Sequence, residues 1–459
     1  MAKSYDAIII GTGQAGPTFA WRLSSSGMNV AIAERKRFGG TCVNTGCIPT
    51  KTLVASARAA YMAGRSAEFG VVIDGEVSVD MKRVKARKDA VVKRSNEGVE
   101  QWLKGMENCD VYESHARFEG SRTVRVGDEL LEAEKVFINV GARAFIPPIP
   151  GIEDVEYLTN SGMMEVDFVP EHLIVVGGGY IGLEFGQMYR RFGSRVTIIE
   201  QGPRLIQHDD DDVSKAVREI LENEGIDVRL DAECITVGRG GDGVVVGMDC
   251  DGEEDKVSGT HLLLAVGRTP NTDDLGLEKT GIEVDERGYI VVDDQLRTKV
   301  DGVWALGDCN GKGAFTHTSY NDYEIVAANL LDDDSRRVTD RILCYALYID
   351  PPLGRVGMTK AQARDSGRNV LIARRDMENV ARAREKGETQ GFMEVLVDAD
   401  SKEILGATIL GIGGDEIIHS VLDIMYAGAS YTVIQRAVHI HPTVSELIPT
   451  MLGSLTPLE

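Results

Sequence analysis

Two cysteines, Cys42 and Cys47, stand close together in the segment RFGGTCVNTGCIPTKTLVASARAAY, and thiols can carry both electron-transfer and metal chemistry. Glycines on either side make the backbone pliable, and Pro49 lies near the expected entry of an alanine-rich helix, where its missing N–H costs little. Both cysteines are therefore expected at a helix start. There the helix dipole favours the thiolate, which attacks disulfides and binds soft metals.

The remaining cysteines argue against a metal centre and against a secreted disulfide framework. The chain contains seven cysteines, an odd number, and apart from the first two they are scattered. A zinc site needs about four ligands, and no second close pair of Cys or His residues accompanies Cys42 and Cys47. The acidic runs at 209–212 and 332–334 are typical of loops and helix starts. We predict no metal site and interpret the other cysteines as structural thiols: Cys109, Cys234, Cys250, Cys309 and Cys344.

The segment directly before the cysteine pair, YDAIIIGTGQAGPTFAWRLSSSGMNVAIAER, indicates a dinucleotide-binding fold. An apolar strand ends at Gly11, a tight turn contains Gly13 and Gly16, and after a helix of small residues a second strand ends at Glu34. Such glycines let the backbone approach a pyrophosphate, the helix N-terminus attracts its charge, and the acid accepts hydrogen bonds from a ribose. A simple packing turn does not need that acid, so we predict an electron-carrying dinucleotide beside the thiols.

The same pattern returns in HLIVVGGGYIGLEFGQMYRRFGSRVTIIE, with Gly177, Gly179 and Gly182 in the turn and Glu200 after the second strand. Two copies imply two bound dinucleotides, and the second is expected to be a nicotinamide. Glu200 can bind a ribose 2′-hydroxyl but would repel a 2′-phosphate, which favours NADH over NADPH. Arg204 stands nearby and weakens that preference.

Length and charge bound the remaining possibilities. The chain has 459 residues and a net charge of −22. A length prior of roughly 150 residues per domain suggests about three domains. The negative charge opposes a general affinity for nucleic acid, and the one basic stretch, 82–94, is typical of a solvated helix face. No apolar run approaches the roughly 18 residues of a membrane helix, and no signal peptide precedes the first strand. We expect a cytoplasmic protein that binds neither nucleic acid nor membranes.

The segment GGTCVNTGCIPTK resembles the active-site signature of the class I pyridine nucleotide–disulfide oxidoreductases, the family of dihydrolipoamide dehydrogenase, glutathione reductase and mercuric reductase. The resemblance extends along the chain through LLLAVGRTPNTDDLGLEKTG and VWALGDCNG, where Asp308 would hold the ribityl chain of FAD. GYIGLE matches a tyrosine gate, Tyr180, and a glutamate, Glu184, that pairs with a lysine beside the flavin; Lys51 fits that lysine.

The C-terminal part resembles the family's dimerisation domain, and its HPxxxE pattern matches an acid–base pair with His441 as the base and Glu446 orienting it. In this family the histidine acts across the subunit interface, which implies an obligate homodimer with shared active sites. The expected fold class is α/β, with two Rossmann-like domains for FAD and NAD and a C-terminal α+β dimerisation domain. We place the FAD domain at 1–149 and 270–340, the NAD domain at 150–269, and the dimerisation domain at 341–459.

The resemblance also implies a role for each of these residues in catalysis or cofactor binding. NADH would reduce the flavin, which would open the Cys42–Cys47 disulfide, so that Cys47 stays near the flavin and Cys42 attacks the substrate. The predicted catalytic residues are Cys42, Cys47, His441, Glu446, Lys51 and Glu184. The predicted FAD site comprises Gly11, Gly13, Gly16, Glu34, Gly40, Thr41, Lys51, Gly141 and Asp308. The predicted NAD site comprises Gly177, Gly179, Tyr180, Ile181, Gly182, Glu200 and Gly267.

Several substrates fit this chemistry. The segment KGAFTHTSYNDYEIV and the run PPLGRVGMT resemble the mercuric-reductase-like branch with its reactive-chlorine-defence reductases, which favours a small disulfide or oxidant as substrate. HIHPTVSE and the expected NAD specificity favour dihydrolipoamide dehydrogenase instead. Reduction of Hg(II) or another metal ion is a third alternative, weakened because the ending LGSLTPLE lacks vicinal cysteines. A flavin-bound redox sensor or complex subunit without turnover is the non-enzymatic alternative.

Overall fold

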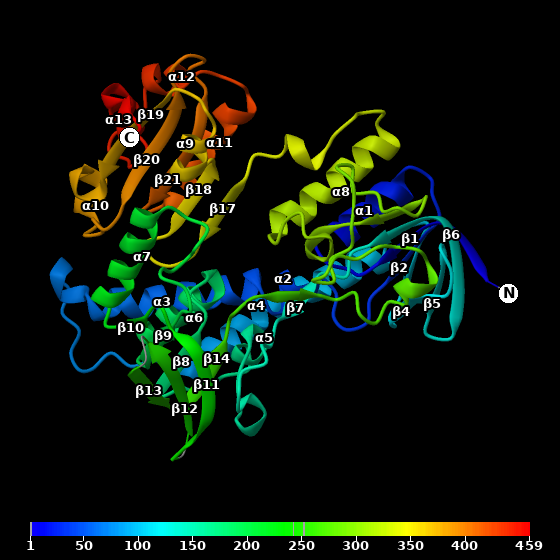
Figure 1. Ribbon diagram of the computed structural model, residues 1–459, viewed down its shortest axis with the longest axis horizontal. Helices are drawn as coiled ribbons and strands as arrows, with labels where there is room; N and C mark the ends of the chain where they lie inside the picture. Colours follow the sequence, from blue (N-terminus) through cyan, green and yellow to red (C-terminus); the bar gives the residue numbers. More distant parts are fainter. Residues whose placement is uncertain (1, 242, 251–252) are drawn as a thin grey trace.

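The computed structural model describes residues 2–241, 243–250 and 253–459, which form three packed regions (Figure 1). The N-terminal region is built on a seven-stranded sheet in which β16 also pairs with β6. Its parallel strands are β1 (Lys3–Ile10), β2 (Val30–Ala33), β3 (Cys109–Tyr112), β6 (Glu129–Ile138) and β16 (Val303–Ala305). The antiparallel strands β5 (Thr123–Val126) and β4 (Ala116–Phe118) extend one edge. Because β16 comes from far along the chain, two distant segments build this region.

Buried apolar residues on both faces explain this sheet. The last four residues of β1 and all of β2 are buried, as expected where helices cover both faces of parallel strands. Phe137 on β6 stacks on Trp304 of β16 with ring centroids 5.0 Å apart, and it meets Phe19 of α1 edge-on at 4.5 Å. Helix α1 (Ala15–Ser25) packs against α8 (Thr316–Leu331).

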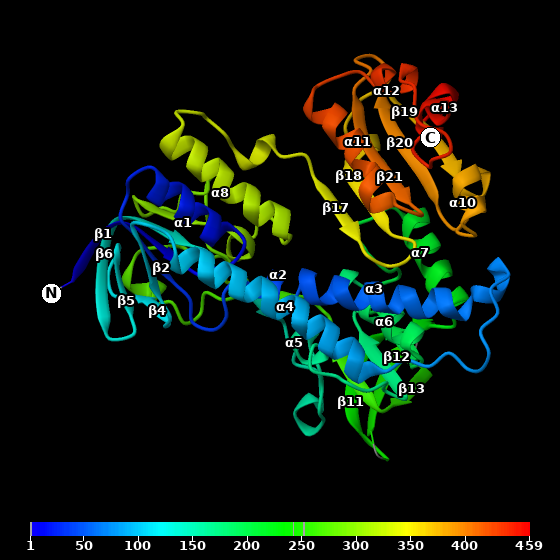
Figure 2. The same ribbon diagram turned by 180° about the vertical axis from the view of Figure 1, so that it is seen from behind.

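Helices α2 (Gly40–Asn44), α3 (Cys47–Gly64) and α4 (Met81–Lys104) connect the first region to the second (Figure 2). Helix α3 contacts both α4 and α6 of the second region. The basic stretch predicted as a solvated face lies on α4, and most of its cations are exposed or half-buried. Lys88 is the exception: it is buried, and its Nζ donates to the carbonyl of Met164 at 2.7 Å.

The second region repeats the βαβ pattern. Its parallel sheet has the order β10-β9-β8-β14, with β8 (His172–Val176), β9 (Arg195–Ile199), β10 (Asp227–Arg229) and β14 (His261–Leu264). Helices α6 (Tyr180–Phe192) and α7 (Asp211–Asn223) follow β8 and β9. A three-stranded antiparallel sheet, β11 (Glu233–Gly240), β12 (Gly243–Cys250) and β13 (Glu253–Gly259), adjoins it. The two-stranded sheet of β7 (Ala142–Ala144) and β15 (Arg268–Pro270) links the regions.

The C-terminal region contains an antiparallel six-stranded sheet in the order β17-β18-β21-β20-β19-β22. The strands are β17 (Cys344–Leu347), β18 (Leu353–Gly357), β19 (Val370–Asp376), β20 (Phe392–Asp398), β21 (Ile404–Leu410) and β22 (Thr456–Pro457). Every residue of β20 and β21 is buried, and α11 (Gly414–Tyr426) packs on β18 and β21. The shorter helices are α5 (Asn160–Met163), α9 (Lys360–Asp365), α10 (Ala381–Glu385), α12 (Thr432–Arg436) and α13 (Leu447–Met451).

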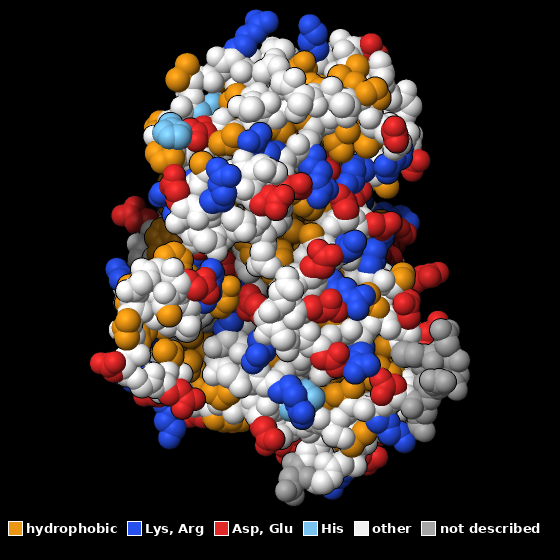
Figure 3. Space-filling model, turned by 90° about the vertical axis from the view of Figure 1, so that its left-hand side faces the viewer, with side chains coloured by type: hydrophobic (Ala, Val, Ile, Leu, Met, Phe, Trp, Pro, Cys, Tyr) orange, Lys and Arg blue, Asp and Glu red, His pale blue; other side chains and the backbone are white. Residues whose placement is uncertain are grey.

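The predicted fold class is confirmed: two Rossmann-like regions carry parallel sheets, and the C-terminal region is an antiparallel α+β unit. The exact domain boundaries stay predictions. On the face shown in Figure 3, Lys and Arg side chains alternate with Asp and Glu side chains. In the parts of the chain that the structure describes, no helix is long and apolar enough to cross a membrane.

Candidate functional site

The cysteine pair lies where two helices meet. Cys42 stands inside the short helix α2, and Cys47 is the first residue of α3, which continues for 18 residues. A Cβ at Gly46 would come within 2.9 Å of the Thr41 carbonyl oxygen, so this tight connection requires glycine. Both cysteines are free thiols; Cys42 is half-buried and Cys47 exposed. The helix start predicted for the pair is confirmed.

The surroundings of the two thiols place the negative charge on Cys47. A hydrogen bond from Cys42, contact with the Thr316 hydroxyl and the nearby Lys51 charge lower the pKa of Cys47 to about 6. Its Sγ lies 3.1 Å from Thr316 Oγ1. The hydrogen bond to Cys47 and burial together raise the pKa of Cys42 well above its usual range. Near neutral pH the pair therefore consists of a Cys47 thiolate and a protonated Cys42.

Lys51 follows Cys47 by about one turn of α3 and joins a buried carboxylate. Its Nζ donates to Glu184 Oε2 at 2.7 Å and lies 4.4 Å from the centre of the Tyr348 ring. The other oxygen of Glu184 accepts the Tyr348 backbone N–H at 3.0 Å. Glu184 is only 5% exposed, so its charge depends on these partners. The predicted Lys51–Glu184 pair is present in the structure.

The first glycine-rich turn is hydrogen-bonded to the acidic residue that follows the second strand. Glu34 accepts hydrogen bonds from the backbone N–H of Thr12 at 3.1 Å and from its hydroxyl at 2.6 Å. Gly11 has a φ of +104°, and a Cβ there would meet the Asn139 carbonyl oxygen at 2.3 Å. Gly40, with a φ of +60°, packs against Gly13 so closely that a Cβ would come within 2.9 Å of the Gly13 Cα.

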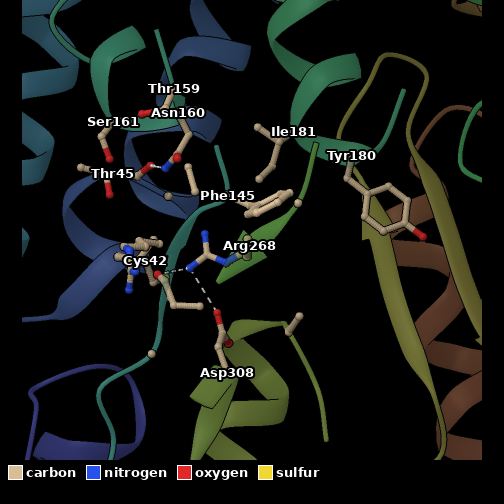
Figure 4. Close-up of a pocket in the computed structure, with 18 of the residues that line it drawn as sticks. Cys42, Thr45, Phe145, Thr159, Asn160, Ser161, Tyr180, Ile181, Arg268 and Asp308 are labelled. Atoms are coloured by element: carbon tan, nitrogen blue, oxygen red, sulfur yellow. Dashed lines mark hydrogen bonds and ion pairs between the residues drawn. The ribbon is translucent and has the colours of Figure 1, made fainter. Parts of the chain in front are cut away.

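Gly40, Thr41, Gly141 and Asp308 line the same cavity as this turn. Burial raises the pKa of Asp308, and Arg268 Nη2 lies 3.3 Å from its carboxylate (Figure 4). Gly141 has a φ of +63°, and a Cβ added there would have no heavy atom within 4 Å, so its backbone is open to the cavity. All of the predicted FAD residues except Gly16 therefore line one cavity.

The second glycine-rich turn has the same design with different partners. Glu200 accepts the backbone N–H groups of Gly178 at 2.6 Å and Gly202 at 2.8 Å, together with Gln207 Nε2 at 2.9 Å. Gly179 has no heavy atom within 4 Å of an added Cβ. Arg204, the residue that weakened the NADH preference, forms an ion pair with Asp211.

One cavity of about 2390 Å³ joins both turns to the cysteine pair. In the view of Figure 4, Phe145, Ile181 and Arg268 lie between Cys42 and Tyr180. Gly267 also lines the cavity. Gly16 and Gly182 do not: a Cβ at Gly16 would meet the Gly11 carbonyl oxygen at 2.4 Å, and one at Gly182 would meet the Gly177 carbonyl oxygen at 2.1 Å. Both glycines therefore serve helix–strand packing beneath their turns, and their assignment to the FAD and NAD sites stays a prediction.

His441 and Glu446 lie outside this cavity. His441 Nδ1 is 3.0 Å from both carboxylate oxygens of Glu446, which fixes the ring as the HPxxxE pattern predicts. The His441 side chain is 76% exposed, whereas that of Glu446 is 15% exposed. The acid–base pair is therefore formed, but the structure of one chain does not bring it to the cysteines.

Sequence reasoning missed the contacts of three residues, of which Thr316 and Cys234 line the cavity and Asp209 does not. Thr316 contacts Cys47, although its segment was used only to compare family branches. Asp209, interpreted as part of a loop, is buried and accepts the phenol of Tyr345 at 2.8 Å. Cys234, interpreted as a structural thiol, is exposed and lines the cavity near the second turn. Cys309 is buried as expected, whereas the side chain of Cys250 lies outside the described residues.

Comparisons with known proteins agree with this geometry. The family model described as pyridine nucleotide-disulphide oxidoreductase matches residues 5–322, and the dimerisation-domain model of the same family matches residues 344–452. The chain is 37% identical over 452 residues to the probable pyridine nucleotide-disulfide oxidoreductase RclA of Escherichia coli, covering 97% of this chain and 98% of the relative.

The chain is also similar to two further relatives with other names. A dihydrolipoyl dehydrogenase of Haloferax volcanii is 32% identical, with 98% of this chain and 95% of the relative covered. A mercuric reductase of Streptomyces lividans is 31% identical, with 98% and 96% covered. The solved structure of the HOCl-induced flavoprotein disulfide reductase RclA superposes with a TM-score of 0.89 at 36% identity, covering 98% of this chain and 99% of that one. The same protein has been solved as a Cu(II) complex.

Proposed function

The chain belongs to the pyridine nucleotide–disulphide oxidoreductase family, and we propose that it passes electrons from NADH through FAD and the Cys42–Cys47 pair to a small disulfide or oxidised-thiol substrate. The family implies FAD and NAD(P) as cofactors and a flavoprotein disulfide reductase of the RclA type. The observation that carries the proposal is the single cavity lined by both glycine-rich turns and by a cysteine pair whose charge rests on Cys47. A cytoplasmic location remains part of the proposal.

The residues present fit an FAD. Gly13, Gly40 and Gly141 offer backbone with no side chain in the way, and the half-buried Asp308 can accept hydrogen bonds from the ribityl hydroxyls. When bound, FAD accepts hydride from the nicotinamide and delivers an electron pair to the disulfide. Lys51, held by Glu184, places a positive charge beside the cavity, where negative charge develops.

The thiols then complete a balanced exchange. Two electrons and the accompanying proton convert the disulfide to the Cys47 thiolate and the Cys42 thiol. Cys42 loses its proton to a base and attacks one sulfur of the substrate disulfide, which releases one thiol and leaves a mixed disulfide. Cys47 next attacks the Cys42 sulfur, which releases the second thiol and restores the pair. We assign the proton transfers to His441 of the partner subunit, oriented by Glu446.

A homodimer would supply that histidine. His441 is exposed, and the side chains around it are apolar: Val438 is 101% exposed and Ile440 80% exposed. Exposed apolar side chains beside a catalytic pair are typical of a surface that another subunit covers. The match to the family's dimerisation domain supports the same assembly.

NADH is favoured over NADPH because Glu200 stands in the turn that would receive the ribose. Its carboxylate would repel a 2′-phosphate. Arg204, the cation that could offset this repulsion, is already paired with Asp211. Tyr180 and Ile181 begin α6 and line the cavity, where the nicotinamide would enter.

Two other substrates have specific support. The His441–Glu446 pair and the Haloferax relative favour lipoamide. The Streptomyces relative and the Cu(II) complex of RclA favour a metal ion, although the described residues contain no group of three His, Cys, Asp or Glu side chains able to hold one.

The deciding experiment is steady-state NADH oxidation by the purified flavoprotein against lipoamide, hypothiocyanous acid, small disulfides, Hg(II) and Cu(II), with the dihydrolipoamide-plus-NAD assay alongside. Strong turnover of a disulfide or oxidised thiol with weak lipoamide activity would support the proposal. Fast lipoamide turnover in both directions would replace it with dihydrolipoamide dehydrogenase, and selective turnover of a metal ion would replace it with metal-ion reduction.

Cys42→Ser tests the assignment of the thiols. We expect it to lower disulfide turnover by at least about a thousandfold, since it removes the attacking nucleophile. Cys47 should remain as a thiolate against oxidised flavin and produce a long-wavelength charge-transfer band. Cys47→Ser is the matched control, because it should lose turnover without forming that band. A band in Cys47→Ser but not in Cys42→Ser would reverse the two roles.

A further inference from the structure

Asp209 is a buried carboxylate that receives two phenols. It lies in the loop before α7 and is 2% exposed. Its Oδ1 accepts the hydroxyl of Tyr345 at 2.8 Å, and its Oδ2 accepts that of Tyr180 at 3.4 Å. The first distance is that of a well-formed O–H···O bond, whereas the second is long. Breaking the hydrogen bond from Tyr180 to Asp209 should therefore cost less free energy than breaking the one from Tyr345.

The position of Asp209 is fixed from the C-terminal region. Arg355 on β18 is 1% exposed; its Nε lies 3.9 Å from Asp209 Oδ1 and its Nη2 lies 3.4 Å from Asp210 Oδ2. The same guanidinium donates to the Met358 carbonyl at 2.9 Å and to the Thr408 hydroxyl on β21. Burial raises the pKa of Asp209, while the Tyr345 hydrogen bond and the Arg355 charge lower it.

The loop that carries Asp209 is also bonded to the second glycine-rich turn. The Asp209 N–H donates to the Ile206 carbonyl at 2.8 Å, and the Ile206 N–H donates to the Gly178 carbonyl at 2.9 Å. Gly178 in turn donates to Glu200 at 2.6 Å. The carboxylate that receives Tyr180 is therefore held at a set position relative to the residues expected to bind the nicotinamide dinucleotide.

The phenols pack into an aromatic cluster that reaches the redox pair. The ring centroids of Tyr180 and Tyr345 are 5.5 Å apart, and Tyr345 stacks on Phe315 at 5.7 Å with an interplanar angle of 8°. Phe315 precedes Thr316, whose hydroxyl contacts Cys47. Tyr345 is thus fixed by parallel stacking as well as by its shorter hydrogen bond, whereas Tyr180 meets Phe315 and Tyr345 at tilted angles of 40° and 39° and is the less firmly held of the two.

From this arrangement we infer that Asp209 is a positioning residue that holds Tyr180 over the nicotinamide side of the cavity, with Tyr345 and Arg355 keeping Asp209 in place. Asp209 reaches Tyr180 rather than the reacting atoms. Entry of the nicotinamide breaks the Tyr180–Asp209 hydrogen bond and leaves the Tyr345–Asp209 bond intact. The inference rests on the proposed function, in which NADH binds beside Tyr180.

The Tyr180–Asp209 hydrogen bond should make the free energy of NADH binding less favourable. A hydrogen bond present only before nicotinamide entry opposes binding, so removing it should tighten binding of NADH. The expected decrease in the NADH KM is about threefold to tenfold, the range for one modest hydrogen bond. The rate constant for disulfide reduction should stay the same, because Asp209 contacts neither cysteine.

A double-mutant cycle tests whether the Tyr180–Asp209 hydrogen bond opposes NADH binding. Tyr180→Phe removes one hydroxyl and keeps the ring, whereas Asp209→Asn removes the charge and keeps the shape. Each should lower the NADH KM, and the double variant should show a smaller decrease than the sum of the two, since both weaken the same bond: Tyr180→Phe removes its donor, and Asp209→Asn replaces its charged acceptor by an amide. Asp210→Asn is the control: it also lies beside Arg355 but contacts neither phenol, and it should leave the KM unchanged.

Flavin reduction by NADH alone, followed by stopped-flow absorbance, separates a failure of the proposed function from a failure of the role assigned to Asp209. If NADH fails to reduce the flavin of the unaltered enzyme, the proposed function is wrong and the role of Asp209 falls with it. If NADH reduces the flavin but the effects of the two substitutions add, or the KM rises in Tyr180→Phe, only the role of Asp209 is overturned. Thermal unfolding of each variant shows whether Asp209→Asn folds. If it does not, the single variants Tyr180→Phe and Tyr345→Phe are compared instead, and only Tyr180→Phe should lower the NADH KM.

Discussion

The two glycine-rich turns of this chain have the same sequence spacing but different surroundings. In the first, Gly13 packs against Gly40, and a Cβ at Gly13 would meet Asn139 Nδ2 at 3.3 Å. In the second, Gly179 at the equivalent position has no heavy atom within 4 Å of an added Cβ. Both turns are closed by a glutamate, so the acid alone does not distinguish them.

The difference lies in what covers each turn. The segment that carries Gly40 and the cysteine pair folds directly over the first turn, and the Gly39 N–H donates to the Thr12 hydroxyl at 3.2 Å. The second turn is bordered by the side chain of Gln207, which bonds Glu200, and by Tyr180. Side chains can move aside, whereas a packed backbone segment cannot. We therefore expect the first site to retain its dinucleotide and the second to exchange it.

Paired glycine substitutions should give the largest contrast. Gly40→Ala forces a side chain onto a φ of +60° and against the Gly13 backbone. A strained non-glycine residue costs about 1–3 kcal/mol, and the close approach adds to it, so purified Gly40→Ala should lose most of its flavin and all turnover. Gly179→Ala meets no protein atom; it should keep its flavin and raise the NADH KM.

The readouts are the ratio of flavin to protein absorbance after gel filtration and the steady-state KM for NADH. Circular dichroism and added FAD show whether Gly40→Ala is folded and can be refilled. A Gly40→Ala protein with one flavin per chain, or a Gly179→Ala protein without flavin, would break the distinction between a retained and an exchanging site.

The two turns and the cysteine pair were predictable from the sequence because each depends on residues within one βαβ unit or one helix start. Gly16 and Gly182 belong to the turns as predicted, whereas their place outside the cavity lining follows only from the three-dimensional packing of helix against strand. The Lys51–Glu184 contact joins distant segments, and it was predicted through family resemblance rather than from local spacing.

Contacts between regions could not be predicted in this way. Asp209 belongs to a run of four acidic residues, and nothing in that run marks the first residue as buried against Tyr345 and Arg355. Thr316 contacts Cys47 only because α8 starts beside α3. Lys88 on the basic helix is buried, and the Met164 carbonyl from a distant segment accepts a hydrogen bond from its ammonium. Such contacts depend on how separate elements meet, which periodicity and composition do not encode.

Removing the charge of Glu200 or of Glu34 tests whether the two sites differ in coenzyme specificity as well as in how firmly they retain a dinucleotide. Glu200→Gln removes the negative charge that opposes a 2′-phosphate and keeps the side chain's shape. The ratio of kcat/KM for NADPH to that for NADH should rise by about tenfold, equal to about 1.4 kcal/mol. Glu34→Gln is the matched variant: it should weaken flavin retention and leave that coenzyme ratio unchanged. An unchanged ratio in Glu200→Gln would show that another residue sets coenzyme preference.

The smallest effect should come from pH and should belong to the first site alone. The pKa of Cys47 is lowered to about 6, so its thiolate persists above that pH and is protonated as the pH falls through it. In the two-electron-reduced enzyme, the charge-transfer absorbance should therefore decline between about pH 7 and pH 5. Thr316→Val removes a hydroxyl that contacts Cys47 Sγ at 3.1 Å and should move the midpoint upward. Glu200→Gln, on the other turn, should leave the midpoint in place; a shift there would mean that the two sites are electrostatically coupled through the cavity they share.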